Sequence, residues 1–284
     1  MNPNAFIEKI FAGRWIAGYS IDDAIEKSKM FNQHGISTLI NFLGENVTEK
    51  KEVNNSIETY IRLINQIKKE KVSASISIKP TQIGLLVGYK FFLSNYLKLA
   101  KLAKMNKINL WLDMEEPEYV DSTIKAYKSS IKYGNTGICI QSYLKRSEKD
   151  VKELVKYNCK IRLVKGAYTI KTGESFKSRR SVNHNFMKLM KTLFEKSDNF
   201  VIATHDTRIV EEAIKLNKIC KKNVTFAMLN GIRNRYAKYL VENKQKVMIY
   251  VPFGKDWMGY SLRRLTEEGH LSLILRSLFE RQTL

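Results

Sequence analysis

The sequence predicts an α/β protein: a closed (β/α)8 TIM-like barrel, formed by a single domain with extra N- and C-terminal helices. Three observations predict it. Short apolar runs recur eight times, segments with helical spacing separate them, and no linker divides the 284 residues, which include only four prolines. Strands that alternate with helices form βαβ units and a parallel sheet. Eight such units in this length favour closure into one barrel over residues 1–284.

The eight runs are rich in β-branched and apolar residues, and each has the length of one strand. They are 37–43, 73–79, 108–114, 136–142, 160–167, 199–205, 223–229 and 246–253. Segments such as 53–70 and 82–105 have helical spacing and many charged residues. Residues 1–34 are expected to form a helical lead-in, and residues 271–284 a final helix. An open doubly wound sheet is the alternative, but no GxGxxG follows any strand.

The chain is strongly basic, with 49 Lys and Arg against 28 Asp and Glu and a net charge of +21. Lysines on solvated helix surfaces explain most of this excess. The remainder suits an anionic partner, and an anionic membrane surface is one candidate.

Cys139, Cys159 and Cys220 have no CxxC spacing and are expected to be small buried hydrophobes in a reducing compartment. The four histidines are scattered, so no metal site is expected. The sequence has no signal-peptide pattern and no run of about 18 apolar residues. These features predict a cytoplasmic protein, with peripheral membrane contact left open.

Polar residues end several of the runs, where the active sites of such barrels lie. They are Lys79, Asp113, Gln141, Lys165, Thr204 and His205. Arg162 lies between two apolar residues, so alternation places it inside the barrel, where a buried guanidinium needs a partner. Tyr250 lies inside the eighth run. Strand ends are often polar, but the whole set favours a site for a polar ligand.

A second candidate segment, WMGYSLRRLTEE at 257–268, follows the last run. Tyr260, Arg263, Arg264 and Glu267 have the spacing of one helix face. Adjacent arginines point about 100° apart on a helix. They can therefore close on one carboxylate from two sides, and Glu267 could hold either arginine in place.

Six motifs occur in order from the second strand to the C-terminus. They are SISIKPTQIG at 75–84, LWLDMEE at 110–116, ICIQSYLKR at 138–146, IRLVKGAY at 161–168, ATH at 203–205 and YVPFG…W…Y..RRL..E at 250–267. In this combination the sequence resembles the proline dehydrogenase family. The resemblance implies a distorted barrel with FAD at its C-terminal mouth. It also implies oxidation of L-proline to 1-pyrroline-5-carboxylate, the first step of proline catabolism, by hydride transfer from C5 to the flavin N5. Electrons would pass to a membrane quinone or another acceptor.

The resemblance also implies residue roles. Asp113 and Arg162 would be catalytic, with Arg162 near the flavin N5. Proline would contact a second set: Lys79, Arg263 and Arg264 at its carboxylate, and Leu229, Tyr250 and Tyr260 at its ring. The cofactor would contact a third set: Gln141, Arg162, Val164, Lys165, Gly166, Ala167, Tyr168, Thr204, His205 and Glu267. Asp113 and a solvent water are both candidates for the general base.

Three departures and two alternatives accompany this interpretation. Ala227 stands where many members have Gln, and Asp206 where Asn is common; the segment 169–181 is only loosely similar. Tyr250 favours proline over hydroxyproline. One alternative is another flavin barrel, similar to methylenetetrahydrofolate reductase. The other is a basic barrel that binds nucleic acid or phosphorylated ligands without redox chemistry, although no nucleic acid is expected.

Overall fold

Eight parallel strands form a closed barrel in the computed structural model, which describes residues 15–166, 173–258 and 260. The strands are β1 (Ser37–Phe42), β2 (Ala74–Ile78), β3 (Leu110–Leu112), β4 (Thr136–Gln141), β5 (Lys160–Val164), β6 (Asn199–Ala203), β7 (Asn223–Leu229) and β8 (Lys246–Phe253). Each strand pairs with the next along the chain, and β8 pairs in parallel with β1. The predicted barrel is confirmed.

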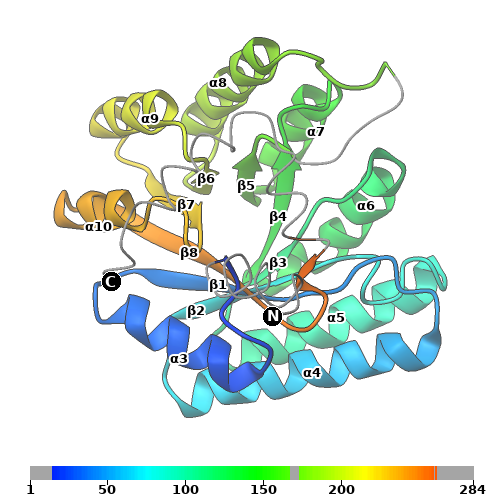
Figure 1. The fold of residues 1–284 in the computed structure, drawn as a ribbon. Coiled ribbons are helices and arrows are strands. Elements are labelled where there is room, and N and C mark those ends of the chain that lie inside the picture. The colour runs from blue at the N-terminus through cyan, green and yellow to red at the C-terminus, as the bar shows by residue number, and fades with distance from the viewer. Residues whose placement is uncertain (1–14, 167–172, 259, 261–284) are drawn as a thin grey trace, which may run out of the picture.

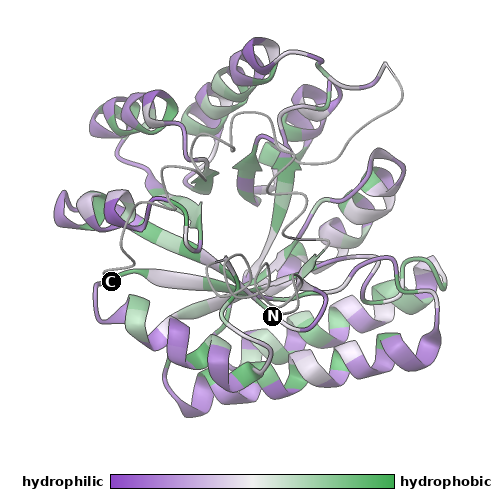
Figure 2. Ribbon diagram, in the orientation of Figure 1, coloured by the Kyte–Doolittle hydropathy of each residue, from purple (hydrophilic) through white to green (hydrophobic). Residues whose placement is uncertain are grey.

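Helices surround the strands (Figure 1). They are α3 (Ile21–Asn32), α4 (Lys50–Lys69), α5 (Tyr89–Met105), α6 (Val120–Ser130), α7 (Ser147–Leu154), α8 (Arg179–Lys196), α9 (Thr207–Cys220) and α10 (Asn234–Glu242). Short 3-10 helices occur at η2 (Pro117–Tyr119), η3 (Ile131–Tyr133) and η4 (Val155–Tyr157). Figure 2 shows apolar residues on the strands and polar residues on the outer sides of the helices.

The helices form because their apolar residues repeat with helical spacing. In α4, Val53, Ile57, Tyr60 and Ile64 are buried, at intervals of three and four residues, and its lysines lie outside this stripe. At the start of α3, the Ser20 side chain accepts from the backbone of Asp23, and the Asp23 side chain accepts in return from the backbone of Ser20. Local sequence therefore sets both the face and the start of these elements.

One predicted helix is shorter than expected. Its apolar spacing begins at residue 82, but α5 begins at Tyr89. Residues 80–87 form turns instead, and Gly84 has φ +111°. A Cβ on Gly84 would lie 2.7 Å from the ring of Phe91, so the chain needs glycine there. The apolar side chains of this segment pack in turns, which periodicity alone does not distinguish from a helix.

Six of the eight predicted strands also end one to three residues earlier than expected. Lys79, Asp113, Lys165 and Thr204 follow their strands rather than closing them. At Lys79 the cause is visible, because its carbonyl oxygen accepts from the amides of the following turn. These side chains thus lie just beyond the sheet, where the backbone turns towards the helices.

Apolar side chains fill both sides of the strands. The cluster inside the barrel comprises Leu39, Trp111, Val201, Ala227 and Met248. The larger core lies between the strands and the helices. Of the lead-in, residues 1–14 lie outside the described residues, as does the expected final helix at 271–284. Residues 257, 258 and 260 are helical.

Cys139 and Cys159 are buried and Cys220 is half-buried, all with free thiols. Among the described residues, no helix has the length and hydropathy needed to cross a membrane. That part of the chain also contains no group of three or more His, Cys, Asp or Glu side chains arranged for a metal ion.

Candidate functional site

A buried carboxylate, Asp113, gathers the polar groups at the C-terminal end of the barrel. Its Oδ1 accepts from the Ser77 hydroxyl and forms a close ion pair with Nη2 of Arg162. Its Oδ2 lies 3.4 Å from Nζ of Lys79 and accepts from the Tyr250 hydroxyl at 3.3 Å. Four residues predicted from the sequence, on or beyond four different strands, therefore meet at one point.

The charged groups of this cluster stabilise one another's ionised forms. Burial opposes ionisation of Asp113, but Arg162, Lys79 and the Ser77 hydrogen bond hold its pKa below the ordinary value. Burial also opposes the charge of Arg162, but Cys139 and Asp113 hold its pKa above the ordinary value. Burial, followed by Asp113, raises the pKa of Tyr250 well above its usual range. At neutral pH the cluster thus contains a carboxylate, a guanidinium and a neutral phenol.

Arg162 lies between two aromatic rings. Its guanidinium carbon is 5.8 Å from the ring centroids of both Trp111 and Tyr250, within the range of cation–π contacts. Its Nε is buried and has no hydrogen-bond partner among the described residues. A buried donor without a partner is costly, so this nitrogen is available to a ligand acceptor.

An apolar wall stands beside the charged cluster. Trp15, Ile16, Leu43, Ile232 and Tyr260 form a buried cluster, against which Leu229, Tyr250 and Trp257 pack. The three residues predicted to contact an apolar ring, Leu229, Tyr250 and Tyr260, therefore lie together. Trp15 was missed by the sequence analysis, because it lies far from every strand end and carries no recognisable motif.

A second part of the site lies at the ends of β4 and β5. The Gln141 amide donates to the carbonyls of Met114 and Glu115 at 3.0 and 2.8 Å, and its Oε1 has no partner among the described residues. Gly166 has φ +106°, and a Cβ there would overlap the Tyr143 ring and lie 2.9 Å from Oε1 of Gln141. The backbone after β5 therefore approaches these side chains as closely as only glycine allows.

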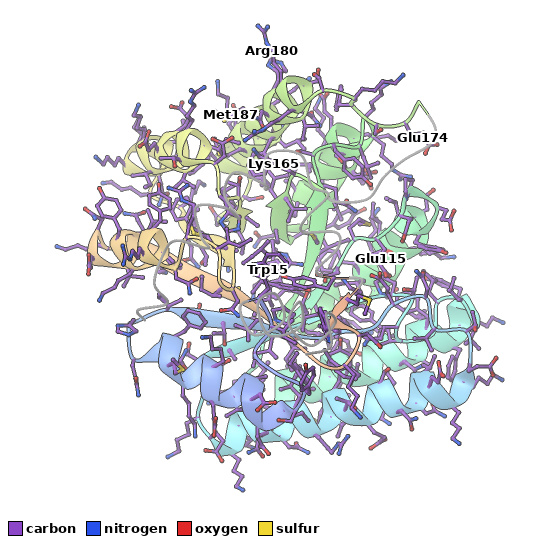
Figure 3. All side chains as sticks on the ribbon, viewed as in Figure 1. Trp15, Glu115, Lys165, Glu174, Arg180 and Met187 are labelled. Carbon is purple, nitrogen blue, oxygen red and sulfur yellow. The ribbon has the colours of Figure 1, made fainter. Side chains whose placement is uncertain are left out.

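The residues after β5 and β6 are linked through Asp206. Its Oδ2 pairs with Nζ of Lys165 at 2.9 Å, and its amide donates to the Thr204 hydroxyl at 3.1 Å. His205 is buried, and its Nε2 accepts from the Leu229 amide at 3.2 Å. The Asp at 206, a departure from the family pattern, thus holds Lys165. In Figure 3, Lys165, Glu115 and Trp15 lie inside the ring of helices, whereas Arg180 projects from its rim.

Glu115 is a buried carboxylate that the sequence analysis did not single out. It accepts from the amide and hydroxyl of Thr81 at 2.8 and 2.7 Å. Burial raises its pKa to about 7, although Lys79 and the Thr81 hydrogen bonds oppose the shift. Its position in the LWLDMEE motif was a signal that could have identified it.

Ser77 and Trp111 were also missed. Ser77 precedes Lys79 by two residues and Trp111 precedes Asp113 by two, so alternation places each on the same face as a predicted site residue. Val164 is half-buried at the end of β5. Other predicted residues, Ala167, Tyr168, Arg263, Arg264 and Glu267, lie outside the described residues.

The chain is similar to known proteins over nearly its whole length. The family model described as Proline dehydrogenase matches residues 24–276. Proline dehydrogenase 2 of Bacillus subtilis (strain 168) is 30% identical over 263 residues, which cover 91% of this chain and 87% of that protein. Proline dehydrogenase 1 of the same strain is 28% identical over 282 residues, covering 98% and 93%. Proline dehydrogenase of Deinococcus radiodurans is 29% identical over 265 residues, covering 90% and 86%.

The fold has a close counterpart among solved structures. Proline utilization A of Bdellovibrio bacteriovorus, in a form inactivated by N-propargylglycine, has a TM-score of 0.88 and 22% identity over 99% of this chain. This chain spans 35% of that longer protein. The likeness shows a shared barrel fold.

Proposed function

This chain belongs to the proline dehydrogenase family, and from that premise we propose that it oxidises L-proline to 1-pyrroline-5-carboxylate with FAD as cofactor. The observation that carries the proposal is the barrel mouth, where a charged cluster around Asp113 adjoins an apolar wall that includes Leu229 and Tyr250. A small ligand with one charged end and one apolar ring matches this arrangement.

Proline would bind with its carboxylate towards cations and its ring towards the apolar wall. Lys79 supplies one cation at the mouth, and by family resemblance Arg263 and Arg264 would supply two more. Charge-assisted bonds to a carboxylate are strong and directional. Leu229, Tyr250 and Tyr260 would pack against the ring. Binding energy from the carboxylate, which is remote from C5, can thus position the reacting carbon.

The residues present fit a flavin. Gln141 Oε1 and Arg162 Nε are a buried acceptor and a buried donor without partners among the described residues, and the flavin ring offers complementary groups. Gly166 lets the backbone after β5 pack against Tyr143 and Gln141, so this backbone lies beside the unpartnered Gln141 Oε1. The contacts would come from Gln141, Arg162, Val164, Lys165, Gly166, Ala167, Tyr168, Thr204, His205 and Glu267. FAD would supply the hydride acceptor, its N5 atom.

The protein's own groups would set the electrostatics of the reaction. Arg162 would keep a fixed positive charge beside the flavin N5, and this charge would favour negative charge on the ring that accepts the hydride. Proline must also lose an ammonium proton. Asp113 is a poor acceptor, because Arg162 and Lys79 hold its pKa low. Of the two candidates for the base, we therefore favour a solvent water, with Asp113 acting to hold the cations.

A quinone-type acceptor would then receive the electrons, and the basic surface would support peripheral contact with an anionic membrane. Each Lys or Arg near such a surface adds about 1 kcal/mol of attraction. Reoxidation of proline-reduced protein by a short-chain quinone, faster than by oxygen, is the expected result. Reoxidation by oxygen alone would contradict this part of the proposal.

Anaerobic mixing of the purified protein with L-proline, while flavin absorbance is followed, tests the reaction directly. Bleaching with proline and much less with hydroxyproline is expected. A flavin band that proline does not bleach would leave a flavin barrel with another substrate. Protein that binds no FAD would refute the cofactor and bring the nucleic-acid or phosphate-binding alternative forward.

A further inference from the structure

Three consecutive residues after β3 hold different parts of the barrel mouth. The Asp113 carboxylate binds the Lys79 ammonium, with 3.4 Å between Oδ2 and Nζ. The carbonyls of Met114 and Glu115 accept from the Gln141 amide at 3.0 and 2.8 Å. The Glu115 carboxylate accepts from the turn after β2. This short segment therefore contacts both a residue proposed to bind proline and a residue proposed to bind the flavin.

The contact between Glu115 and the turn after β2 is buried on both sides. Thr81 has no exposed surface, and Glu115, labelled in Figure 3, is 1% exposed. The Thr81 amide donates to Oε2 of Glu115 at 2.8 Å, and the Thr81 hydroxyl donates to Oε1 at 2.7 Å. Hydrogen bonds to an ionised carboxylate are short and strong. One residue of the turn therefore binds both oxygens of the carboxylate.

The turn that contains Thr81 begins at Lys79. The Lys79 carbonyl accepts from the amides of two later residues of the turn at 3.1 and 3.3 Å. Between them in sequence, Pro80 has a fixed φ and restricts the residue before it. Because Thr81 is bound to Glu115, this turn has little freedom to shift. The backbone of Lys79 is thus held through Glu115, and its ammonium is held by Asp113.

The Thr81 hydroxyl has a second partner, on the segment after β1. It accepts from the Asn46 amide at 2.9 Å, and the Thr81 carbonyl accepts from the Val47 amide at 3.3 Å. The hydroxyl thus donates to Glu115 and accepts from Asn46, so both of its hydrogen-bonding roles are used. Replacing this hydroxyl by a methyl group removes both bonds without any change of charge.

From this geometry we propose that Glu115 is a positioning residue for proline: by binding Thr81 it holds the turn that places the Lys79 ammonium. The inference rests on the proposed function, in which Lys79 binds the proline carboxylate. A lysine side chain has many rotamers, and fixing it at both ends before the ligand arrives reduces the entropy lost on binding. A turn released from Glu115 should therefore weaken proline binding, although Glu115 itself does not touch proline.

The test follows anaerobic flavin reduction by L-proline in the FAD-loaded protein, because its dependence on proline concentration gives both an apparent Kd and a limiting rate. Measurement at about pH 8 keeps Glu115 ionised, since burial raises its pKa to about 7. Thr81→Val should raise the apparent Kd about tenfold and change the limiting rate about twofold or less. Thr81→Ser keeps the hydroxyl and should stay within about twofold of wild type in both quantities.

A matched control removes a hydroxyl at the opposite end of the barrel. Thr38 is as buried as Thr81, lies near the start of β1 and donates to the Ser28 hydroxyl. Thr38→Val should leave the apparent Kd for proline unchanged. Flavin content and melting temperature show that each variant is folded. An equal rise of Kd in Thr38→Val or in Thr81→Ser would overturn the proposal, because the loss would then not come from the hydroxyl that binds Glu115.

Substitutions of Glu115 test the other side of the contact. Glu115→Gln keeps an acceptor for the Thr81 amide, whereas Glu115→Leu leaves both Thr81 donors buried without this partner. The apparent Kd should therefore rise more in Glu115→Leu than in Glu115→Gln. A wild-type Kd in Glu115→Leu would overturn the proposal.

A double-mutant cycle shows whether Thr81 acts through Lys79. Lys79→Met alone should weaken proline binding, and adding Thr81→Val should weaken it about twofold or less further. A tenfold further loss in the double variant would overturn the proposal, because Thr81 would then act independently of Lys79. Failure of the proposed function would look different, since proline would then not reduce the flavin of the wild-type protein at all.

Discussion

At the scale of single residues, the Asp113 carboxylate binds two cations and two hydroxyls in the barrel mouth. Removing one partner of a buried ion pair typically costs about 3–5 kcal/mol, since the other charge stays buried. Asp113→Asn should therefore lower the free energy of unfolding by about that amount at neutral pH. Urea unfolding of both proteins measures it.

The pH dependence of this loss gives an independent check. Because the pKa of Asp113 is lowered in the folded protein, its stabilisation is present above the unfolded-state value and is lost as pH falls through the folded value. The difference between wild type and Asp113→Asn should hence shrink below about pH 4. A difference that stays constant into acid would mean that the carboxylate charge is not what stabilises the cluster.

Gly166 provides a second test at this scale. Gly166→Ala places a methyl group against Tyr143 at φ +106°. The backbone strain costs about 1–2 kcal/mol, and overlap with the Tyr143 ring adds to it. FAD binding should therefore weaken about tenfold or more. The flavin-to-protein absorbance ratio reports this directly. Gly173→Ala is the control, because nothing lies within 4 Å of its Cβ. If both variants retain flavin equally, the close approach at Gly166 has no role in binding.

The residues whose position at the barrel mouth could be predicted are those whose position follows from local rules. Alternation placed Arg162 inside the barrel, and strand ends identified Lys79 and Asp113. Trp15 could not be found in this way, since only the folded chain brings it beside Tyr260. The bond between Lys165 and Asp206 is likewise tertiary, because it joins the ends of two strands.

Among elements, the turn after β2 depends on the carboxylate that follows β3. Glu115 accepts both hydrogen bonds from Thr81 and has a pKa of about 7 in place of 4.5. Between pH 4.5 and about pH 7, Glu115 is ionised in the unfolded chain but still protonated in the folded chain. Stability should therefore fall as pH rises from about 4.5 to about 7 and level off above. Melting temperatures across this range should show a smaller fall for Glu115→Gln, and an identical fall would exclude Glu115 as its source.

Strand β4 contains a glycine because the neighbouring strand carries a tryptophan. A Cβ on Gly137 would overlap the Trp111 ring, and that ring lies against Arg162. Gly137→Ala should cost about 1–3 kcal/mol by overpacking and slow flavin reduction by displacing Arg162. Adding Trp111→Phe provides the smaller ring and should recover part of the stability. If the double variant recovers no stability, overlap with the Trp111 ring is not the source of the loss.

The apolar pattern predicted a start for α5 at residue 82, but the helix begins at Tyr89. Residues 82–88 continue the apolar character of the helix, so periodicity extends it too far. Pro80, Gly84 and Gly88 were the opposing signals, because proline and glycine favour turns. The sequence does not show that these signals prevail, because the turn is held by tertiary hydrogen bonds from Thr81 to Glu115.

At the scale of the whole molecule, the regular alternation of strands and helices was enough to predict closure. Each βαβ unit is local, and parallel strands with right-handed crossovers have few arrangements available. The pairing of β8 with β1 then follows from the number of units. The contents of the mouth do not follow in this way, since they depend on side chains from most of the strands meeting at one end.

The net charge of +21 makes a prediction for the whole chain. Self-repulsion destabilises a compact basic protein, and salt screens it over a Debye length of about 10 Å at 0.1 M. Raising sodium chloride from about 10 mM to about 150 mM should therefore raise the melting temperature. Each kcal/mol by which salt reduces the repulsion corresponds to about 2–4 °C in a chain of this class.

Lys68→Glu/Lys71→Glu/Lys107→Glu removes two positive charge units per substitution and lowers the net charge to +15. Because repulsion is then weaker, this variant should show a smaller rise. A melting temperature that falls with salt would mean that attractive ion pairs, such as Lys165 with Asp206, outweigh the repulsion of the lysine excess.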